Sequence, residues 1–320
     1  MGKKAKLRHE AVVISRRCGG SRRHQQNRHQ LIQPLLTYLQ VVGSLPDRIK
    51  DVDQQCAKEY FRVRVVKGDT PGHLHNIASA LRVVLRNAGR DTQDFSNADL
   101  SIPPRDRTGK RQPISDSAYI SRMNALRIAN EGLYHVAKLS RLLGLRTMEA
   151  LMCGPSLLDW VRALEIGPVT ALYVTRGTKN GRHREVEPIF SRVTETQAAV
   201  SAAMEFYTLH GALVGIPGDL KTSAYKMRRI YRSVGFRGEY SPHTLRYAYA
   251  CDKAIELLSQ GMTNREVLVR LSRYLGHGDS RYRWIKSVYC RSLIDVFAQN
   301  ADNMNGAGAT IEPTRDSAKQ

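Results

Sequence analysis

Apolar residues in the first third of the chain recur three or four positions apart, which is the spacing of one face of a helix. Three such segments follow one another between residues 26 and 90, and Gly68 and Gly89 end the second and the third. Thr70-Pro71 supplies an N-cap and a first-turn proline where the third segment begins. The pattern predicts a helical domain over residues 26–90.

Helical spacing is lost over residues 91–113, which are polar, charged and include Pro103-Pro104. Such a stretch between helical regions is typical of a linker between domains. Helical spacing returns over residues 114–300, whereas residues 301–320 hold too few apolar side chains to fold. We therefore expect a larger second domain after the linker and a disordered tail at the end.

One segment of the second domain departs from the helical pattern. Residues 170–176 and 185–190 have strand character, and Asn180-Gly181 between them is a strong turn signal. The fold class that follows is mainly α with a small β-hairpin (α+β).

Charge adds a functional expectation to this outline. The 320 residues carry a net charge of +21, which indicates a polyanionic partner and favours nucleic acid. The excess is uneven, because residues 1–30 hold nine Lys and Arg against a single acid, Glu10. Residues 1–25 are therefore expected to be either a basic arm that follows phosphates or a solvated tail, and the sequence leaves both open.

Cysteine usage and hydropathy exclude several classes of protein. The five cysteines are scattered, odd in number and never spaced as C-x-x-C, which argues against a disulfide framework and fits a reducing compartment. The spacing of Cys18, His24 and His29 matches no standard zinc ligand set. No apolar run approaches the roughly 18 residues that span a bilayer. We expect a cytoplasmic protein with no membrane partner, metal or cofactor.

Two motifs early in the second domain carry charged residues that suit phosphate chemistry. Arg146 and Glu149 fall three apart in an apolar segment and so share one helix face. They form either a structural ion pair or an arginine that packing points at a phosphate. Lys179 stands in the hairpin turn, where it is either simply solvated or a proton donor that reaches into DNA.

A further motif combines a histidine with an arginine at a helix start. Ser241-Pro242 supplies a cap and a first-turn proline, so that His243 lies near free N–H groups that favour an anion. Arg246 follows one turn later on the same face. The pair is either a capping histidine with a surface arginine or an anion site.

The last motifs surround a second histidine. A capping box at Thr263 begins a helix, Leu275-Gly276 ends it, and His277 lies in the turn. The next helix carries Tyr282 and Tyr289. Aromatic residues at helical spacing are more often core than chemistry, so neither tyrosine is a strong candidate by itself.

Taken in order, these motifs resemble the signature of the tyrosine recombinase (phage integrase) family over about residues 26–295. Residues 142–151 look like its first arginine box, and Lys179, with Arg184 and Pro188 behind it, looks like its hairpin lysine. Two further boxes are similar to its His-x-Leu-Arg and Leu-Gly-His motifs. The catalytic residues that the resemblance implies are Arg146, Lys179, His243, Arg246, His277 and Tyr289.

The tyrosine spacing departs from the family's commonest pattern. There the nucleophile lies about nine residues after the histidine of the Leu-Gly-His turn, where this chain has Lys286. Tyr289 lies twelve residues after that histidine and Tyr282 five. The two residues before Tyr289 look more like the nucleophile box, so we prefer it. Tyr247 stands where many family members have histidine.

The resemblance implies a site-specific recombinase, or integrase of a mobile element, that cuts and rejoins DNA without metal or ATP. The two arginines would clamp the scissile phosphate, with His277 as a further donor. Tyr289 would attack and form a 3′-phosphotyrosine. His243 would act as proton acceptor or further phosphate donor, and the hairpin lysine would protonate the 5′-oxygen.

The same resemblance implies the partners and the role of each domain. The first domain resembles the family's core-binding (SAM-like) domain, which with the catalytic domain would clamp double-stranded DNA. Four protomers would assemble on two DNA sites, with accessory DNA-bending or directionality proteins. The alternatives are a type IB topoisomerase-like enzyme, which uses a similar residue set, and a DNA-binding protein that keeps the fold but does not cut.

Overall fold

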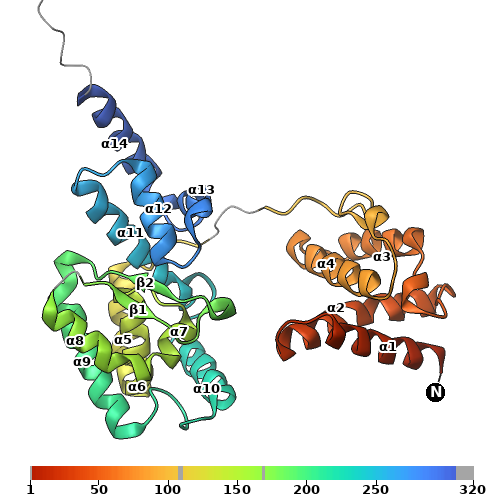
Figure 1. Cartoon of the computed structure of the whole chain (residues 1–320), viewed down its shortest axis with the longest axis horizontal. Coiled ribbons are helices and arrows are strands. Elements are labelled where there is room, and N and C mark those ends of the chain that lie inside the picture. Colours follow the sequence, from red (N-terminus) through yellow and green to blue (C-terminus); the bar gives the residue numbers. More distant parts are fainter. Residues whose placement is uncertain (1, 107–110, 168–169, 308–320) are drawn as a thin grey trace, which may run out of the picture. The chain divides into compact units, whose positions relative to one another are not determined.

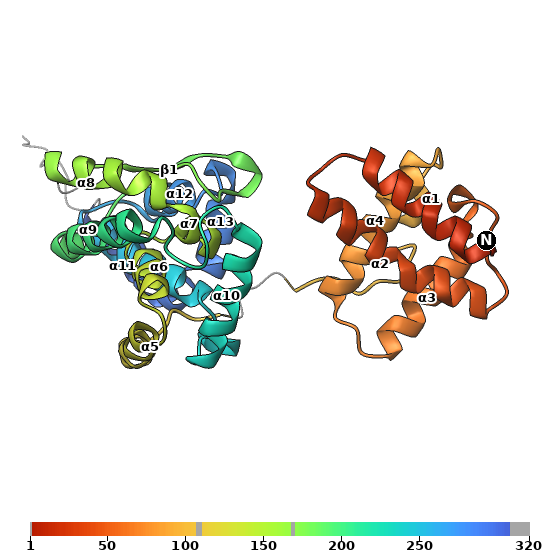
Figure 2. The same cartoon turned by 90° about the horizontal axis from the view of Figure 1, so that it is seen from below.

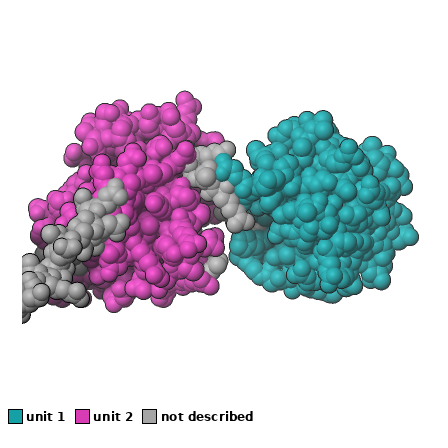
Figure 3. All heavy atoms as spheres, turned by 90° about the horizontal axis from the view of Figure 1, so that it is seen from above, with its two compact units in different colours: residues 1–107 teal, residues 108–320 magenta. Residues whose placement is uncertain are grey.

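Side chains cap three of the helices of the first unit, which covers residues 1–107 (Figure 3). The computed structural model describes residues 2–106, 111–167 and 170–307. Ser21, Asp53 and Thr70 each accept a hydrogen bond from the backbone N–H three residues further on. The helices of this unit, red to orange in Figures 1 and 2, are α1 (Lys3–Arg17), α2 (Arg22–Val41), α3 (Gln54–Val66) and α4 (Pro71–Asn87).

The start of the chain differs from the expected basic arm or solvated tail. Leu7, Ala11 and Ile14 form one face of α1 and are buried in the core of the first unit, against α2 and α4. Their spacing of four and three is that of a helix face. The many basic residues around them outweighed this apolar stripe in the sequence-based expectation. Because the stripe is buried, the segment is an integral part of the helical unit.

Part of the expected linker also belongs to the first unit. Phe95, Leu100 and Ile102 are buried in the same core as α1 to α4. The two units divide between Arg107 and Thr108, which lies inside the expected range of 91–113, and residues 107–110 fall outside the described part of the chain.

Helices also dominate the second unit, residues 108–320. They are α5 (Asp116–Ala129), α6 (Glu131–Leu142), α7 (Thr147–Met152), α8 (Leu157–Ile166), α9 (Val193–His210), α10 (Leu220–Ser233), α11 (His243–Ser259), α12 (Asn264–Tyr274), α13 (Tyr282–Val288) and α14 (Ile294–Ala307). The expectation of disorder from residue 301 is wrong for residues 301–307, which continue α14. Residues 308–320 lie outside the described residues.

The predicted hairpin is present and short. Strands β1 (Leu172–Val174) and β2 (Arg184–Val186) pair antiparallel, with Leu172 opposite Val186. Between them, Gly181 adopts a φ of +68°, which the Asn-Gly turn signal anticipates. Strand residues alternate between the core and the surface, as period-two geometry requires. The fold class, mainly α with a small β-hairpin, is confirmed.

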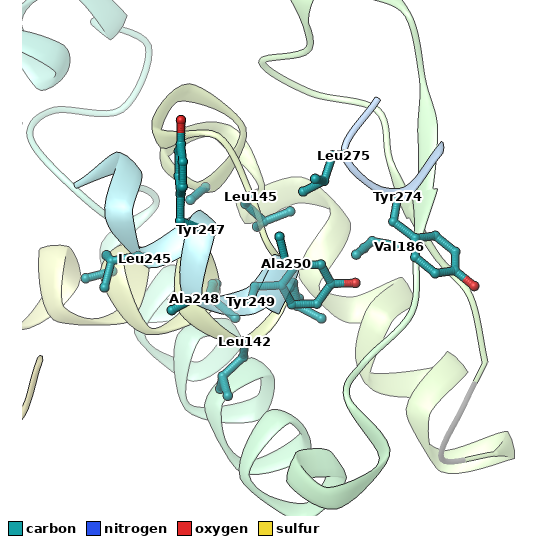
Figure 4. Close-up of a cluster of buried hydrophobic side chains, with 14 of the residues drawn as sticks. Leu142, Leu145, Val186, Leu245, Tyr247, Ala248, Tyr249, Ala250, Tyr274 and Leu275 are labelled. Carbon is teal, nitrogen blue, oxygen red and sulfur yellow. The ribbon is translucent and has the colours of Figure 1, made fainter. Parts of the chain in front are cut away.

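A close backbone approach fixes the turn before α7. Tyr249 of α11 is fully buried in the apolar cluster of Figure 4, which also contains Leu145 and Leu275. The turn at Gly144 has a φ of +57°, and a Cβ there would come within 2.3 Å of the Tyr249 ring. Only glycine allows both the conformation and the contact. The tyrosine therefore fixes the direction in which the chain leaves this turn.

Among the described residues, no helix combines the length and the apolar character needed to cross a bilayer.

The packing of α1 can be tested by truncating its buried face. We expect Leu7→Ala, which removes a fully buried side chain, to lower the free energy of unfolding of the first unit by about 2–5 kcal/mol. Urea unfolding of the full chain, followed by amide hydrogen exchange in α2 and α4, measures this. Lys6→Ala on the exposed face of α1 is the matched control, with an expected change within about 0.5 kcal/mol. Equal stabilities of the two variants would contradict the docking of α1.

Candidate active site

Arg146 is held from two sides at the start of α7. Its backbone N–H donates to Glu149 Oε2 (2.7 Å), and its guanidinium donates to Glu149 Oε1 (2.5 Å). The Glu149 side chain is fully buried, whereas that of Arg146 remains 21% exposed. The carboxylate thus fixes both the backbone and the side chain of Arg146 and leaves part of the guanidinium open to a ligand.

Arg246 meets Arg146 at one backbone carbonyl. It is fully buried on α11 and donates to the carbonyl oxygens of Gly144 and Leu275. Arg146 Nη2 donates to the same Leu275 oxygen (2.9 Å). Two arginines that lie a hundred positions apart in the sequence therefore converge through the turn that follows α12.

The hydroxyl of Tyr289 lies at the centre of this group. Arg246 Nε donates to it at 3.2 Å, and His243 Nε2 and His277 Nε2 lie 3.3 Å and 3.5 Å from it. Tyr289 follows the last residue of α13 and is 2% exposed. The structure therefore brings together five of the expected residues, which are Arg146, His243, Arg246, His277 and Tyr289.

Aromatic rings fix the plane of the Tyr289 phenol. The Tyr247 ring stacks at a centroid distance of 4.5 Å with 32° between the planes, and Trp284 meets the phenol edge-on at 5.5 Å. The sequence indicated neither contact. Tyr247 thus fills the position where many family members have histidine, and it does so as a packing partner of Tyr289.

Tyr282 points to a different part of the surface. It lines a separate pocket of about 440 Å³ with Arg283 and Lys286. Its hydroxyl accepts a hydrogen bond from Arg283 Nε (3.1 Å). No hydrogen bond or ring contact of the described residues links Tyr282 to the two arginines.

Lys179 shares a cavity with the group without touching it. It is exposed on the hairpin turn, and it lines a pocket of about 760 Å³ together with Arg146 and His277. Arg182 on the hairpin and Arg273 on α12 line the same pocket. A DNA backbone that entered this pocket would meet basic side chains from both the hairpin and α12.

Glu149 and Arg184 form a charged core beneath the site. Arg184 Nη2 donates to Glu149 Oε2 (2.8 Å), and Arg246 Nη1 lies 3.8 Å from the same oxygen. Burial by itself would raise the pKa of Glu149, but Arg184, Arg246 and Arg146 together lower it to about 2. Glu149 is therefore ionised at every physiological pH.

The sequence held a signal for Arg184 that motif spacing did not use. Strand alternation puts it on the same face as the buried Val186, with Glu185 facing outward. Its side chain is only 3% exposed. An arginine at an inward strand position needs a buried partner, and Glu149 is that partner.

Both histidines of the site are neutral at pH 7. Burial and the positive charge of Arg246 lower the pKa of His243 to about 4 and that of His277 to about 3. A neutral imidazole can accept a proton from a phenol, whereas an imidazolium cannot.

Within the described residues, no group of three or more His, Cys, Asp or Glu could hold a metal ion.

Family models match both units of the chain. A model described as "Phage integrase, N-terminal" matches residues 4–93, and a model described as "Integrase" matches residues 102–252. The second match ends before His277 and Tyr289. A search of curated proteins finds no match.

Solved structures of integrases share the fold. A lambda integrase dimer bound to a COC′ core site is 18% identical with a TM-score of 0.55, and the match covers 86% of this chain and 93% of that one. The Tn1549 transposon integrase in complex with transposon right end DNA is 14% identical with a TM-score of 0.54, over 95% and 99% of the two chains. A lambda integrase tetramer bound to a Holliday junction is 17% identical with a TM-score of 0.53, over 87% and 76%.

The chain therefore belongs to the tyrosine recombinase (phage integrase) family, whose enzymes break and rejoin DNA strands. The expected resemblance is confirmed, together with a helical N-terminal unit of the phage integrase type.

The low histidine pKa values predict a loss of stability in acid. His243 and His277 have pKa values of about 4 and about 3 in the fold, against an ordinary value of 6.5. Between these limits the unfolded chain binds more protons, so the free energy of unfolding falls as the pH drops from about 6.5 towards 4. We expect His277→Asn to lose less free energy of unfolding than the wild type between pH 7.5 and pH 5, as measured by urea unfolding at both pH values. His183→Asn, at an exposed position, is the control, and an equal acid loss in both variants would contradict the assignment.

Proposed function

We propose that this chain is a site-specific recombinase, the integrase of a mobile element, which cuts and rejoins double-stranded DNA through a 3′-phosphotyrosine at Tyr289. The observation that carries the proposal is the position of the Tyr289 hydroxyl. It lies within 3.5 Å of Arg246 Nε and of the Nε2 atoms of His243 and His277. Arg146 binds the same backbone carbonyl as Arg246.

The residues divide the work of phosphodiester cleavage. Arg146 and Arg246 hold the non-bridging oxygens and offset the charge that repels a nucleophile. His277 donates a hydrogen bond to the same phosphate, and the neutral His243 takes the phenol proton. The Tyr289 oxygen then forms a bond to phosphorus while the bond from phosphorus to the 5′-oxygen breaks.

Lys179 completes the step from the hairpin. Its ammonium group protonates the departing 5′-oxygen, which is a poor leaving group without that proton. Its exposed position in the lining of the 760 Å³ pocket, which His277 also lines, supports this role. The new phosphotyrosine ester stores the energy of the broken strand, and a 5′-hydroxyl reverses the step, so that ATP is not required. The arginines supply the positive charge that a metal ion would otherwise provide.

The proposed substrate is duplex DNA gripped by both units. The net charge of +21 supports a grip made largely of phosphate contacts, which weakens as salt rises. The similar lambda integrase structures include a dimer on a core site and a tetramer on a Holliday junction. On that basis we propose a homotetramer on two DNA sites. The proposal also includes a cytoplasmic location and accessory DNA-bending or directionality proteins, which the resemblance to the family implies.

Covalent trapping tests the nucleophile. The substrates are duplexes that tile the DNA flanking the gene of this chain, each nicked so that a cleaved end diffuses away. We expect the wild-type chain to form a protein–DNA adduct stable in detergent on one of them. Tyr289→Phe should abolish the adduct because it removes only the attacking oxygen, and Tyr282→Phe should retain it.

The outcomes of this trapping experiment separate the alternatives. Loss of the adduct in Tyr282→Phe alone would overturn the assignment of Tyr289. Binding without any adduct would indicate a DNA-binding protein that does not cut. Adducts on every duplex, with relaxation of plasmids that lack the flanking DNA, would indicate a topoisomerase.

A sulfur leaving group tests the role of Lys179. We expect Lys179→Ala to slow cleavage of the trapped duplex by about 100- to 10,000-fold. Replacing the bridging 5′-oxygen by sulfur should restore most of the rate, because a thiol has a pKa of about 8.5 and departs without a proton. Arg246→Ala is the control, since sulfur cannot replace a guanidinium on the phosphate. Equal rescue of both variants would contradict the proton transfer.

A further inference from the structure

Arg184 is buried beneath the proposed site, and both of its Nη atoms donate to protein acceptors, whereas its Nε has no hydrogen-bond partner among the described residues. Its Nη2 donates to Glu149 Oε2 (2.8 Å) and to the Gly144 carbonyl (3.3 Å), and its Nη1 donates to the Tyr274 carbonyl. The side chain is 3% exposed, whereas that of Arg146 is 21% exposed. Arg184 is therefore not arranged to bind a phosphate itself.

The charges of this cluster are unequal in number. Arg146, Arg184 and Arg246 surround the single carboxylate of Glu149 within 3.8 Å, which leaves a formal surplus of two positive charges. Without Arg184, the carboxylate would be shared by Arg146 and Arg246 alone. A scissile phosphate would then compete with Glu149 for both guanidinium groups.

The same arginine ties together the turns that carry the site. The Gly144 carbonyl accepts from both Arg184 and Arg246. The Tyr274 carbonyl, which Arg184 binds, directly precedes the Leu275 carbonyl that Arg146 and Arg246 share. Arg184 thus links β2 to the turn before α7 and to the end of α12.

We infer that Arg184 is a positioning residue for strand cleavage: it neutralises Glu149, so that Arg146 and Arg246 keep their positive charge for the phosphate. The inference rests on the proposed function. It assigns to β2 a role beyond that of presenting the hairpin lysine. It also predicts that the effect of an Arg184 substitution on the cleavage rate depends on the charge at Glu149.

A double-mutant cycle tests that dependence. The full chain and its Arg184→Met, Glu149→Gln and double variants are compared in single-turnover cleavage of the nicked duplex that traps the wild type, at saturating protein. We expect Arg184→Met to slow cleavage by about 10- to 100-fold, the effect of losing a hydrogen bond to a charged group. In the Glu149→Gln background, which has no carboxylate to neutralise, the same substitution should change the rate less than about threefold.

If Arg184→Met by itself does not fold, the comparison in the Glu149→Gln background still tests the inference, because a loss of more than about threefold there would overturn it. The double variant lacks the buried carboxylate that Arg184→Met leaves short of a partner. An equal loss of rate from Arg184→Met in both backgrounds would overturn the inference and leave only a structural role. An unchanged rate in a folded Arg184→Met variant would overturn it as well.

A matched control separates the effect of removing any buried arginine from the effect of removing the one beside Glu149. Arg141 is also buried, and its ion pair is with Asp252 (2.5 Å) rather than with Glu149. We expect Arg141→Met to lower the melting temperature while the folded protein cleaves at the wild-type rate. If the wild-type chain traps no duplex at all, the proposed function fails and this inference fails with it. If the wild type and a folded Arg184→Met trap equally fast, only this inference fails.

Discussion

The buried carboxylate of Glu149 is the interaction on which the rest of the site depends. Three guanidinium groups so close together in the interior repel one another strongly because water is excluded, and the Glu149 carboxylate offsets that repulsion. Glu149 ties Arg146, at the N-cap of α7, and Arg184 of β2 together through short hydrogen bonds, and Arg246 of α11 lies 3.8 Å away. One acidic side chain thus joins three elements that the sequence keeps far apart.

Backbone carbonyl groups complete the arrangement of donors. The oxygens of Gly144 and Leu275 accept from the guanidinium groups, and both belong to turns that glycine makes possible, at residues 144 and 276. The guanidinium groups are therefore oriented before any substrate arrives. Donors that need no rearrangement are the most effective at stabilising developing charge. Burial and, after it, the surplus positive charge lower the pKa values of His243 and His277 and keep both side chains neutral, and a bound phosphate would relieve that surplus.

Local signals in the sequence anticipated much of the fold. The Asn-Gly turn, the capping threonines at 70 and 263 and the Leu-Gly turn before His277 all appear where they were expected. Each depends on a few neighbouring residues. The first helix was missed because charge outweighed a stripe of three apolar residues, and the choice between the two tyrosines could not be made from spacing. The Tyr289 hydroxyl lies among Arg246 and the two histidines, whereas Tyr282 lines a separate pocket, and this difference depends on how α13 packs.

The sequence by itself determined the helices after the first one, the hairpin, the basic character and the order of the chemistry-bearing residues, because these follow from local propensity and spacing. Only the tertiary structure decided that the Tyr289 hydroxyl meets Arg246 and two histidines, and that Arg184 lies inside and pairs with Glu149. These contacts join residues 12 to 46 positions apart. Their geometry depends on the packing of whole elements, which no short stretch of sequence encodes.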